Sequence, residues 1–149
     1  FTTLYPNLGV ISYANFSELV IADIPGIIKN ASEGVGLGIK FLGHIEKCKL
    51  LIHFLDCTEK NILTNYNIIR TELKKYSSLL DKKKEIIVLT KADLIKTNEM
   101  KLKIKKLKDK LKSDICSISI TDNDSIHNLK KLLLSESNNN QVVKKTWSP

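Results

Sequence analysis

Apolar runs of strand length alternate along this chain with segments whose apolar residues recur at helical spacing. Residues 10–13 and 18–23 are two short apolar runs separated by Ala-Asn-Phe-Ser, which predicts a β-hairpin. The runs KLLIHFLD (residues 49–56), EIIVLTKAD (from Glu85) and DICSIS (residues 114–119) predict further strands that are largely buried.

The segments between these strands have the apolar spacing of amphipathic helices, each with one buried face. The predicted buried positions are Ile39, Leu42, Ile45 and Cys48 in the first helix, Ile62, Tyr66, Ile69 and Leu73 in the second, and Met100, Ile104, Leu107 and Leu111 in the third. A last helix is predicted over residues 125–134. Strands that alternate with helices are joined by parallel crossovers. The pattern therefore predicts a three-layer α/β fold with a mostly parallel sheet, whose first strand pair is antiparallel.

The composition changes at Ser135, where the polar sequence SESNNNQVVKKTWSP begins. A segment so poor in apolar residues cannot bury a core, which predicts a flexible tail. The chain has 149 residues, of which 42% are hydrophobic, so it is long enough to form one domain with a core of its own. We therefore expect one domain at residues 1–136 and a tail at residues 137–149.

The composition also excludes several classes of protein. No apolar run approaches the roughly 20 residues that a membrane span requires, and the chain does not open with a signal-peptide pattern. The cysteines, Cys48, Cys57 and Cys116, are odd in number and form no Cys-x-x-Cys pair, so the sequence indicates neither a disulfide framework nor a zinc site. These features predict a cytoplasmic protein that does not bind a membrane.

The chain is strongly basic, with a formal net charge of +8, which favours a polyanionic neighbour such as nucleic acid. Many of its lysines belong to one predicted helix, at positions 101, 103, 105, 106, 108, 110 and 112. Lysines around an amphipathic helix usually form a solvated face. Contact with RNA is the alternative.

Polar residues stand at the ends of several predicted strands, namely Asp23, Asp56, residues 90–93 and Ser119. In an open α/β sheet, ligands bind outside the carboxyl ends of the parallel strands. These residues are therefore candidates for one site at that edge.

The motifs around these residues resemble those of the Obg family of translation-factor-related GTPases. The segments FTTLYPNLGV, ADIPGIIKNASEGVGLGIKFLGHIEK, TKAD and SIT occur in the order and spacing of that family, up to about Leu134. The resemblance implies the three-layer α/β sandwich of P-loop NTPases, here a partial G domain. It also implies a monomeric, cytoplasmic GTPase that binds GTP, GDP and Mg²⁺ and acts in assembly of the large ribosomal subunit, in contact with ribosomal RNA.

The first part of the resemblance concerns the nucleotide phosphates. It implies that Thr3 holds Mg²⁺ and the γ-phosphate, and that Asp23 reaches Mg²⁺ through a water, as suits a hard cation. Gly26 has no side chain, so its N–H can approach the γ-phosphate and respond to its loss. The phosphate-side residues implied by the resemblance are Phe1, Thr2, Thr3, Asp23, Ile24, Pro25 and Gly26.

The second part concerns the base. Asp93 can accept two hydrogen bonds from guanine, a pattern that adenine lacks, and the stem of Lys91 can lie across the base plane. Thr90 stands where most relatives have Asn, which favours a weaker affinity for guanine. The base-side residues implied by the resemblance are Thr90, Lys91, Ala92, Asp93, Ser119, Ile120 and Thr121.

Two departures from the family pattern carry predictions. The phosphate loop of the family would precede Phe1, so we expect that the chain starts inside switch I and is inactive by itself. Ile27 stands where Ras-like GTPases have a water-orienting glutamine, which leaves the catalytic group unassigned.

The alternative function is a basic ribosome- or RNA-binding module with a GTPase-like fold and no nucleotide chemistry. Asp56 falls outside the nucleotide motifs and is interpreted as structural.

Overall fold

Three parallel strands form the centre of the molecule. The structure is a computed structural model, which describes residues 7–12, 18–23, 47–76 and 78–139. The strands β3 (Leu51–Asp56), β4 (Glu85–Thr90) and β5 (Asp114–Ser117) form a sheet in the order β3-β4-β5. The residues of β4 from Ile86 to Leu89 are fully buried, as expected of a central parallel strand that is covered on both faces.

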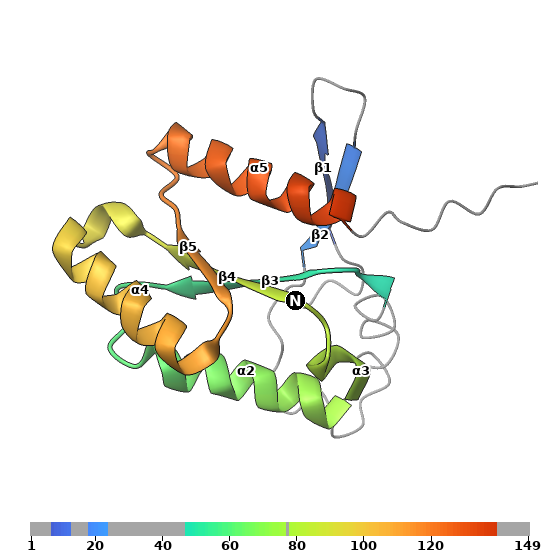
Figure 1. Ribbon diagram of the computed structural model, residues 1–149, viewed down its shortest axis with the longest axis horizontal. Coiled ribbons are helices and arrows are strands. Elements are labelled where there is room, and N and C mark those ends of the chain that lie inside the picture. Colours follow the sequence, from blue (N-terminus) through green and yellow to red (C-terminus); the bar gives the residue numbers. More distant parts are fainter. Residues whose placement is uncertain (1–6, 13–17, 24–46, 77, 140–149) are drawn as a thin grey trace, which may run out of the picture.

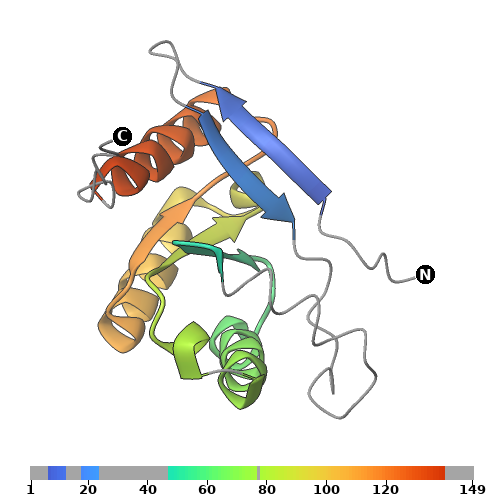
Figure 2. The same ribbon diagram turned by 90° about the vertical axis from the view of Figure 1, so that its right-hand side faces the viewer.

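Helices cover both faces of this sheet, so the fold has three layers (Figures 1 and 2). One face is covered by α2 (Ile62–Tyr76) and α4 (Thr97–Leu111), and the opposite face by α5 (Asn123–Asn139). Two shorter helices, α3 (Ser78–Asp81) and the 3₁₀ helix η2 (Ala92–Leu94), flank β4 in the sequence. The predicted three-layer α/β fold with parallel crossovers is confirmed.

The alternation of side chains along β4 divides the core into two parts. Ile87 and Leu89 point to α2 and α4, where they pack with Tyr66, Met100 and Leu107. Ile86 and Val88 point to the opposite face of the sheet. There they pack against Leu129 and Leu133 of α5. The apolar stripes predicted for α2 and α4 are thus the faces that these helices bury.

The N-terminal hairpin is confirmed, but it forms a sheet of its own. Strands β1 (Asn7–Ser12) and β2 (Glu18–Asp23) are antiparallel, with Asn7 opposite Asp23. Within the described residues, neither strand is hydrogen-bonded to the three-stranded sheet, so the expectation of one continuous sheet is not met there. Ile11, Leu19 and Ile21 instead pack against the core on the α5 side, so apolar contact attaches the hairpin.

Helix α5 is longer than the sequence predicts. It reaches Asn139, so residues 135–139, which the polar composition assigns to the tail, are helical. An ion pair of 2.6 Å between Glu136 and Lys84 joins this end of the helix to the residue that precedes β4. The helix predicted around Ile39 and the remainder of the tail lie outside the described residues. In the described ranges, no helix combines the length and hydropathy needed to cross a bilayer.

Candidate functional site

The three parallel strands end side by side, and their last residues form the candidate site. Asp56 is the register partner of Thr90 on the neighbouring strand. On the other side of β4, the Ile118 N–H donates to the Leu89 carbonyl at 2.8 Å, and the Ala92 N–H donates to the Ile118 carbonyl at 3.1 Å. The segment after β4 is therefore held between the ends of β3 and β5.

A sharp turn directs this segment across the edge of the sheet. Lys91 has φ 59° and ψ 37°, in the left-handed region that few residues other than glycine adopt. This conformation costs a lysine roughly 1–2 kcal/mol, which the surrounding contacts must offset. The Leu94 N–H closes the turn by donating to the Lys91 carbonyl at 3.0 Å.

Asp93 and Ser119, which are far apart in the sequence, meet beyond this turn. The Ser119 hydroxyl donates to Oδ1 of Asp93 at 2.5 Å, and it accepts from the Thr121 N–H at 3.2 Å. The hydroxyl oxygens of Ser119 and Thr121 lie 2.8 Å apart. Ser119 is only 3% exposed, whereas Asp93 is exposed. Ser119 thus fixes Oδ1 of Asp93, and no described residue donates to Oδ2.

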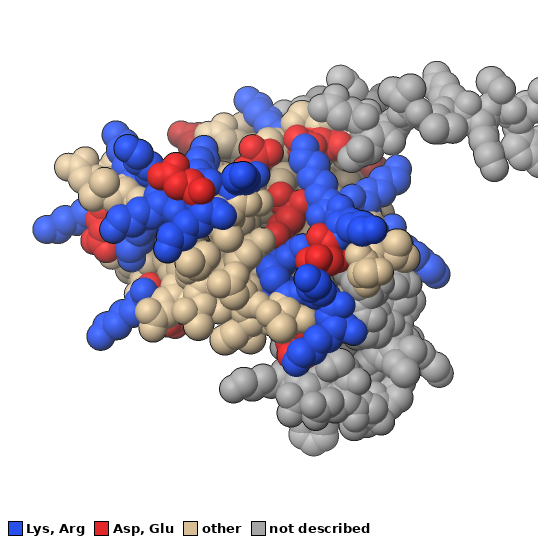
Figure 3. Space-filling view, turned by 60° about the horizontal axis from the view of Figure 1, so that its bottom comes forward, with Lys and Arg blue, Asp and Glu red and all other residues tan. Residues whose placement is uncertain are grey.

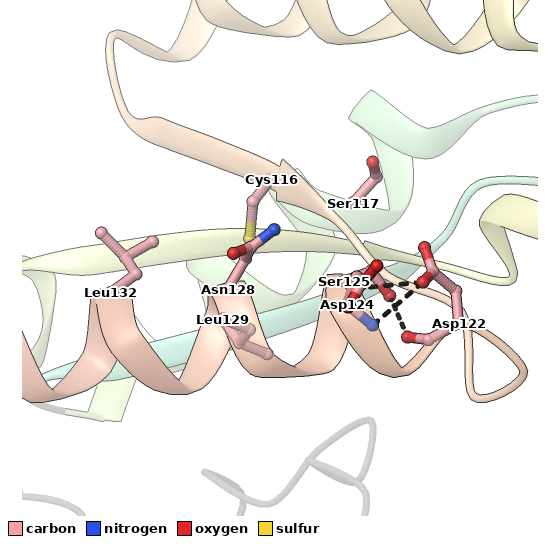
Figure 4. A pocket seen from close by; sticks show the side chains of 8 residues that line it. All are labelled: Cys116, Ser117, Asp122, Asp124, Ser125, Asn128, Leu129 and Leu132. Carbon is pink, nitrogen blue, oxygen red and sulfur yellow. Dashed lines mark hydrogen bonds between the residues drawn. The ribbon is translucent and has the colours of Figure 1, made fainter.

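The loop that carries Ser119 is anchored on the start of α5. The Ser119 N–H donates to the Ser125 hydroxyl at 3.1 Å, and that hydroxyl donates to the Asp122 carbonyl at 2.7 Å. Asp122 caps the helix, because its Oδ1 accepts from the N–H groups of Asp124 and Ser125 at 3.0 and 3.3 Å (Figure 4). Asp122 and Ser125 therefore hold the loop in place.

Lys91 points to the opposite neighbour, β3. Its Nζ lies 2.5 Å from Oδ2 of Asp56. The other oxygen of Asp56, Oδ1, accepts from the Thr58 N–H at 2.8 Å and from the Thr58 hydroxyl at 2.6 Å. The hydrogen bond from Lys91, followed by those from Thr58, lowers the pKa of Asp56 to about 2, and the same bond from Asp56 raises the pKa of Lys91. Both groups are charged at neutral pH.

Thr90 and Cys57 complete the connection between the two strand ends. The Thr90 hydroxyl donates to the Leu55 carbonyl at 3.3 Å, so it joins β4 to β3. In return, the Cys57 N–H donates to the Thr90 carbonyl at 3.2 Å, and Sγ of Cys57 donates to the Lys91 carbonyl at 3.2 Å. Cys57 is completely buried, and this burial raises the pKa of its thiol.

The other predicted site residues are less closely connected. Ile120 is 88% exposed, and Asp23 lies exposed at the end of β2. The remaining phosphate-side residues lie outside the described residues, and they are Phe1, Thr2, Thr3, Ile24, Pro25 and Gly26. Among the residues that the structure does describe, no three metal-ligating side chains form a group.

A hollow of about 410 Å³ lies beside the site, between β5 and the first turns of α5 (Figure 4). Its lining includes Cys116, Asn128 and Leu129, together with the capping residue Asp122. Neither Lys91 nor Asp93 contributes to it, so the hollow is separate from the cluster at the strand ends.

Asp56 and Thr58 also belong to the cluster at the strand ends, because Asp56 pairs with Lys91 and Thr58 holds its carboxylate. Neither residue belongs to a nucleotide motif. The position of Asp56 at a strand end already makes it a candidate from the sequence, although the motifs favour a structural interpretation, and no signal in the sequence points to Thr58.

The chain is similar in sequence to known GTPases. Residues 1–91 match the family described as 50S ribosome-binding GTPase. The chain is 47% identical over 135 residues to GTPase Obg of Pelagibacter ubique, which covers 91% of this chain and 41% of that protein. It is also 47% identical over 134 residues to GTPase Obg of Rickettsia prowazekii, with coverage of 90% and 40%. The chain thus spans about two fifths of the length of these curated relatives.

A solved structure has the same fold. Translation elongation factor SelB from Methanococcus maripaludis, in complex with the GTP analogue GppNHp, superposes with a TM-score of 0.65 over 98% of this chain and 31% of its own. At 20% sequence identity, this likeness concerns the fold alone.

Proposed function

The chain belongs to the Obg family of GTPases, and from this premise we propose that the protein is a GTP-binding and GTP-hydrolysing switch that acts in assembly of the large ribosomal subunit. The observation that carries the proposal is the bond of 2.5 Å between Ser119 and Asp93 at the carboxyl edge of the sheet. It holds an exposed carboxylate in one orientation at the place where α/β sheets bind ligands.

Asp93 supplies the preference for guanine. A carboxylate accepts hydrogen bonds, and guanine offers the donors N1–H and N2–H₂ side by side. Adenine has an acceptor at N1 and lacks the amino group at C2, so it leaves the carboxylate unpaired. An unpaired polar group in a binding site costs roughly 1–3 kcal/mol, which supports discrimination against ATP.

The neighbours of Asp93 have supporting roles in this proposal. The aliphatic stem of Lys91 lies over one face of the base, and the N–H of Ile120 donates to the base oxygen, so the exposed side chain of Ile120 is not involved. The Thr90 hydroxyl is already bonded to Leu55, which is consistent with a role in positioning the turn and not in contacting the base.

The phosphate side of the site would hold Mg²⁺. Asp23 is an exposed carboxylate at the end of β2, and Mg²⁺ prefers such hard oxygen ligands. Thr3 would supply the second oxygen, and Gly26 would report the γ-phosphate; both lie outside the described residues. The cation would neutralise charge on the phosphates during transfer of the γ-phosphoryl group.

Helix α4 supports contact with ribosomal RNA. Its basic residues gather on one side of the molecule (Figure 3). Five lysines of the helix and its C-cap residue are exposed and form what we call the α4 lysine face: Lys101, Lys105, Lys106, Lys108, Lys110 and the C-cap Lys112. No described acidic residue forms an ion pair with any of them, whereas Lys103 pairs with Glu99 at 3.2 Å. Unpaired surface cations attract the phosphates of RNA.

The experiment that tests the nucleotide assignment is the substitution Asp93→Asn in the natural-length protein. An asparagine amide offers a donor where the carboxylate offers only acceptors, so it matches xanthine, whose O2 replaces the N2 amino group. We expect affinity for GDP to fall roughly 10- to 100-fold and affinity for xanthosine diphosphate to rise, since one unpaired polar group costs about 1–3 kcal/mol.

Calorimetry with GDP, ADP and xanthosine diphosphate gives the three affinities. Asp124→Asn is the matched control, because Asp124 is an exposed acid on α5 outside the proposed base site. An unchanged base preference in Asp93→Asn would contradict the proposed role of Asp93. Wild-type protein without affinity for any guanine nucleotide would instead favour the RNA-binding module.

A further inference from the structure

The segment at the end of β3 contacts the end of β4 and the turn after it through Asp56 and Cys57, and Thr58 supports Asp56. Asp56 pairs with the ammonium of Lys91 at 2.5 Å. Cys57 donates from its N–H to the Thr90 carbonyl and from its Sγ to the Lys91 carbonyl, both at 3.2 Å. Thr58 holds the carboxylate of Asp56. We call residues 56–58 the β3 clasp.

The β3 clasp holds Lys91 at both ends. The buried thiol of Cys57 bonds its carbonyl, and the carboxylate of Asp56 bonds its Nζ. The Lys91 side chain as a whole is 56% exposed, so it remains available to a ligand. A lysine side chain is flexible, and binding must order it. A stem that is already ordered lowers that cost.

Asp56 is itself held by Thr58. Its Oδ1 accepts two hydrogen bonds from Thr58, so the carboxylate cannot rotate to follow the lysine. The other nearby acid, Glu59, contributes only long-range attraction to Lys91, and within the described part of the chain Asp56 alone forms an ion pair with it. The position of the ammonium is therefore set by β3.

We propose that Asp56 is a positioning residue of the guanine site, which holds Lys91 so that its stem covers the base. The role rests on the proposed function, because it presumes that a guanine base binds between Lys91 and Asp93. Asp56 does not contact the nucleotide in this proposal. It acts through the ammonium of Lys91, and Thr58 acts through Asp56.

If Asp56 had only a structural role, its substitution would change the free energy of unfolding but not the rate at which the nucleotide dissociates. A positioning role has two further consequences. Removal of the Asp56 charge should speed the dissociation of the nucleotide. This effect should also vanish in a protein whose Lys91 has lost its ammonium, because Asp56 then has nothing to hold.

The experiment measures dissociation of a fluorescent GDP analogue from the natural-length protein. The variants are Asp56→Asn, Thr58→Ala, Lys91→Met and the double variant Asp56→Asn with Lys91→Met. Glu59→Gln is the matched control, since it removes an equal charge only three positions away without breaking an ion pair. We expect Asp56→Asn to dissociate about three- to tenfold faster and Thr58→Ala about twofold faster, and the double variant to match Lys91→Met.

Each result decides between the possibilities. The positioning role would be overturned if Asp56→Asn and Glu59→Gln gave the same dissociation rate. It would also be overturned if the fold-changes in dissociation rate caused by Asp56→Asn and Lys91→Met multiplied in the double variant. Thermal unfolding shows whether each variant is folded, and if Asp56→Asn is not, Thr58→Ala decides by the same comparison. If the wild-type protein binds no guanine nucleotide, both the proposed function and this role are overturned. If the wild-type protein binds guanine nucleotide but the variants dissociate at the wild-type rate, this role alone is overturned.

Discussion

Ser119 offers a direct test of how the structure prepares Asp93 for a base. Its hydroxyl is buried, lies 2.5 Å from Oδ1 of Asp93 and also accepts from the Thr121 N–H. The substitution Ser119→Ala removes only this oxygen. The carboxylate of Asp93 then loses the donor that fixes it, and it is free to rotate into solvent.

The expected magnitude follows from the surroundings of the bond. A hydrogen bond to a charged group contributes about 1.5–3 kcal/mol. Asp93 and Thr121 are both exposed, so water can replace the lost partner in the free protein, and we expect the free energy of unfolding to fall by only about 1 kcal/mol. With nucleotide bound, the orientation of Asp93 matters more, and we expect GDP to dissociate roughly 5- to 30-fold faster, which corresponds to about 1–2 kcal/mol.

The assay compares the affinities for GDP and inosine diphosphate in the natural-length protein. Inosine lacks the N2 amino group, so the ratio of the two affinities reports the bond that Asp93 makes to that group. We expect this ratio to fall towards one in Ser119→Ala. Ser135→Ala is the matched control, because Ser135 is an exposed residue of α5 whose hydroxyl donates to the Leu132 carbonyl at 2.7 Å and bonds no other residue in the described ranges. A ratio and a dissociation rate equal to those of Ser135→Ala would refute the role given to Ser119.

Two further predictions concern other parts of the molecule. Replacing Lys101, Lys105 and Lys108 by glutamine should weaken binding to the large subunit. It should also reduce the slope of log affinity against log salt concentration by about 0.9 for each RNA phosphate that the variant no longer neutralises. An equal change on replacing Lys60, Lys130 and Lys131 would show that only total charge matters. The side chain of Glu85 is only 7% exposed, and this burial raises its pKa, but the hydrogen bonds from His53 and Tyr66 and the charge of Arg70 lower the pKa overall. Its charge therefore stabilises the fold above the usual glutamate pKa and ceases to do so as pH falls through the lowered value. Glu85→Gln should cost about 1–3 kcal/mol at pH 7 in urea unfolding and less at pH 3, and a pH-independent cost would contradict this.

The sequence by itself predicted the longer strands and helices of the described residues and their order. The continuous apolar run of β4 and the helical spacing of Tyr66 and Met100 with their neighbours are local patterns, and local patterns reflect which residues can be buried in a strand or a helix. The motifs also predicted that Asp93, Lys91 and Ser119 belong to one site, because a family resemblance compares residues one by one without needing their distances.

Only the tertiary structure decided which side chains meet. Asp56 and Lys91 are 35 positions apart, and their contact depends on the register of β3 against β4 and on the left-handed backbone of Lys91, neither of which any local pattern specifies. The end of α5 was also decided at long range, since Glu136 pairs with Lys84 across 52 positions in a segment whose composition alone favours a tail. A local pattern records how apolar each residue is, but the contact between two side chains depends on backbone geometry that the whole fold sets.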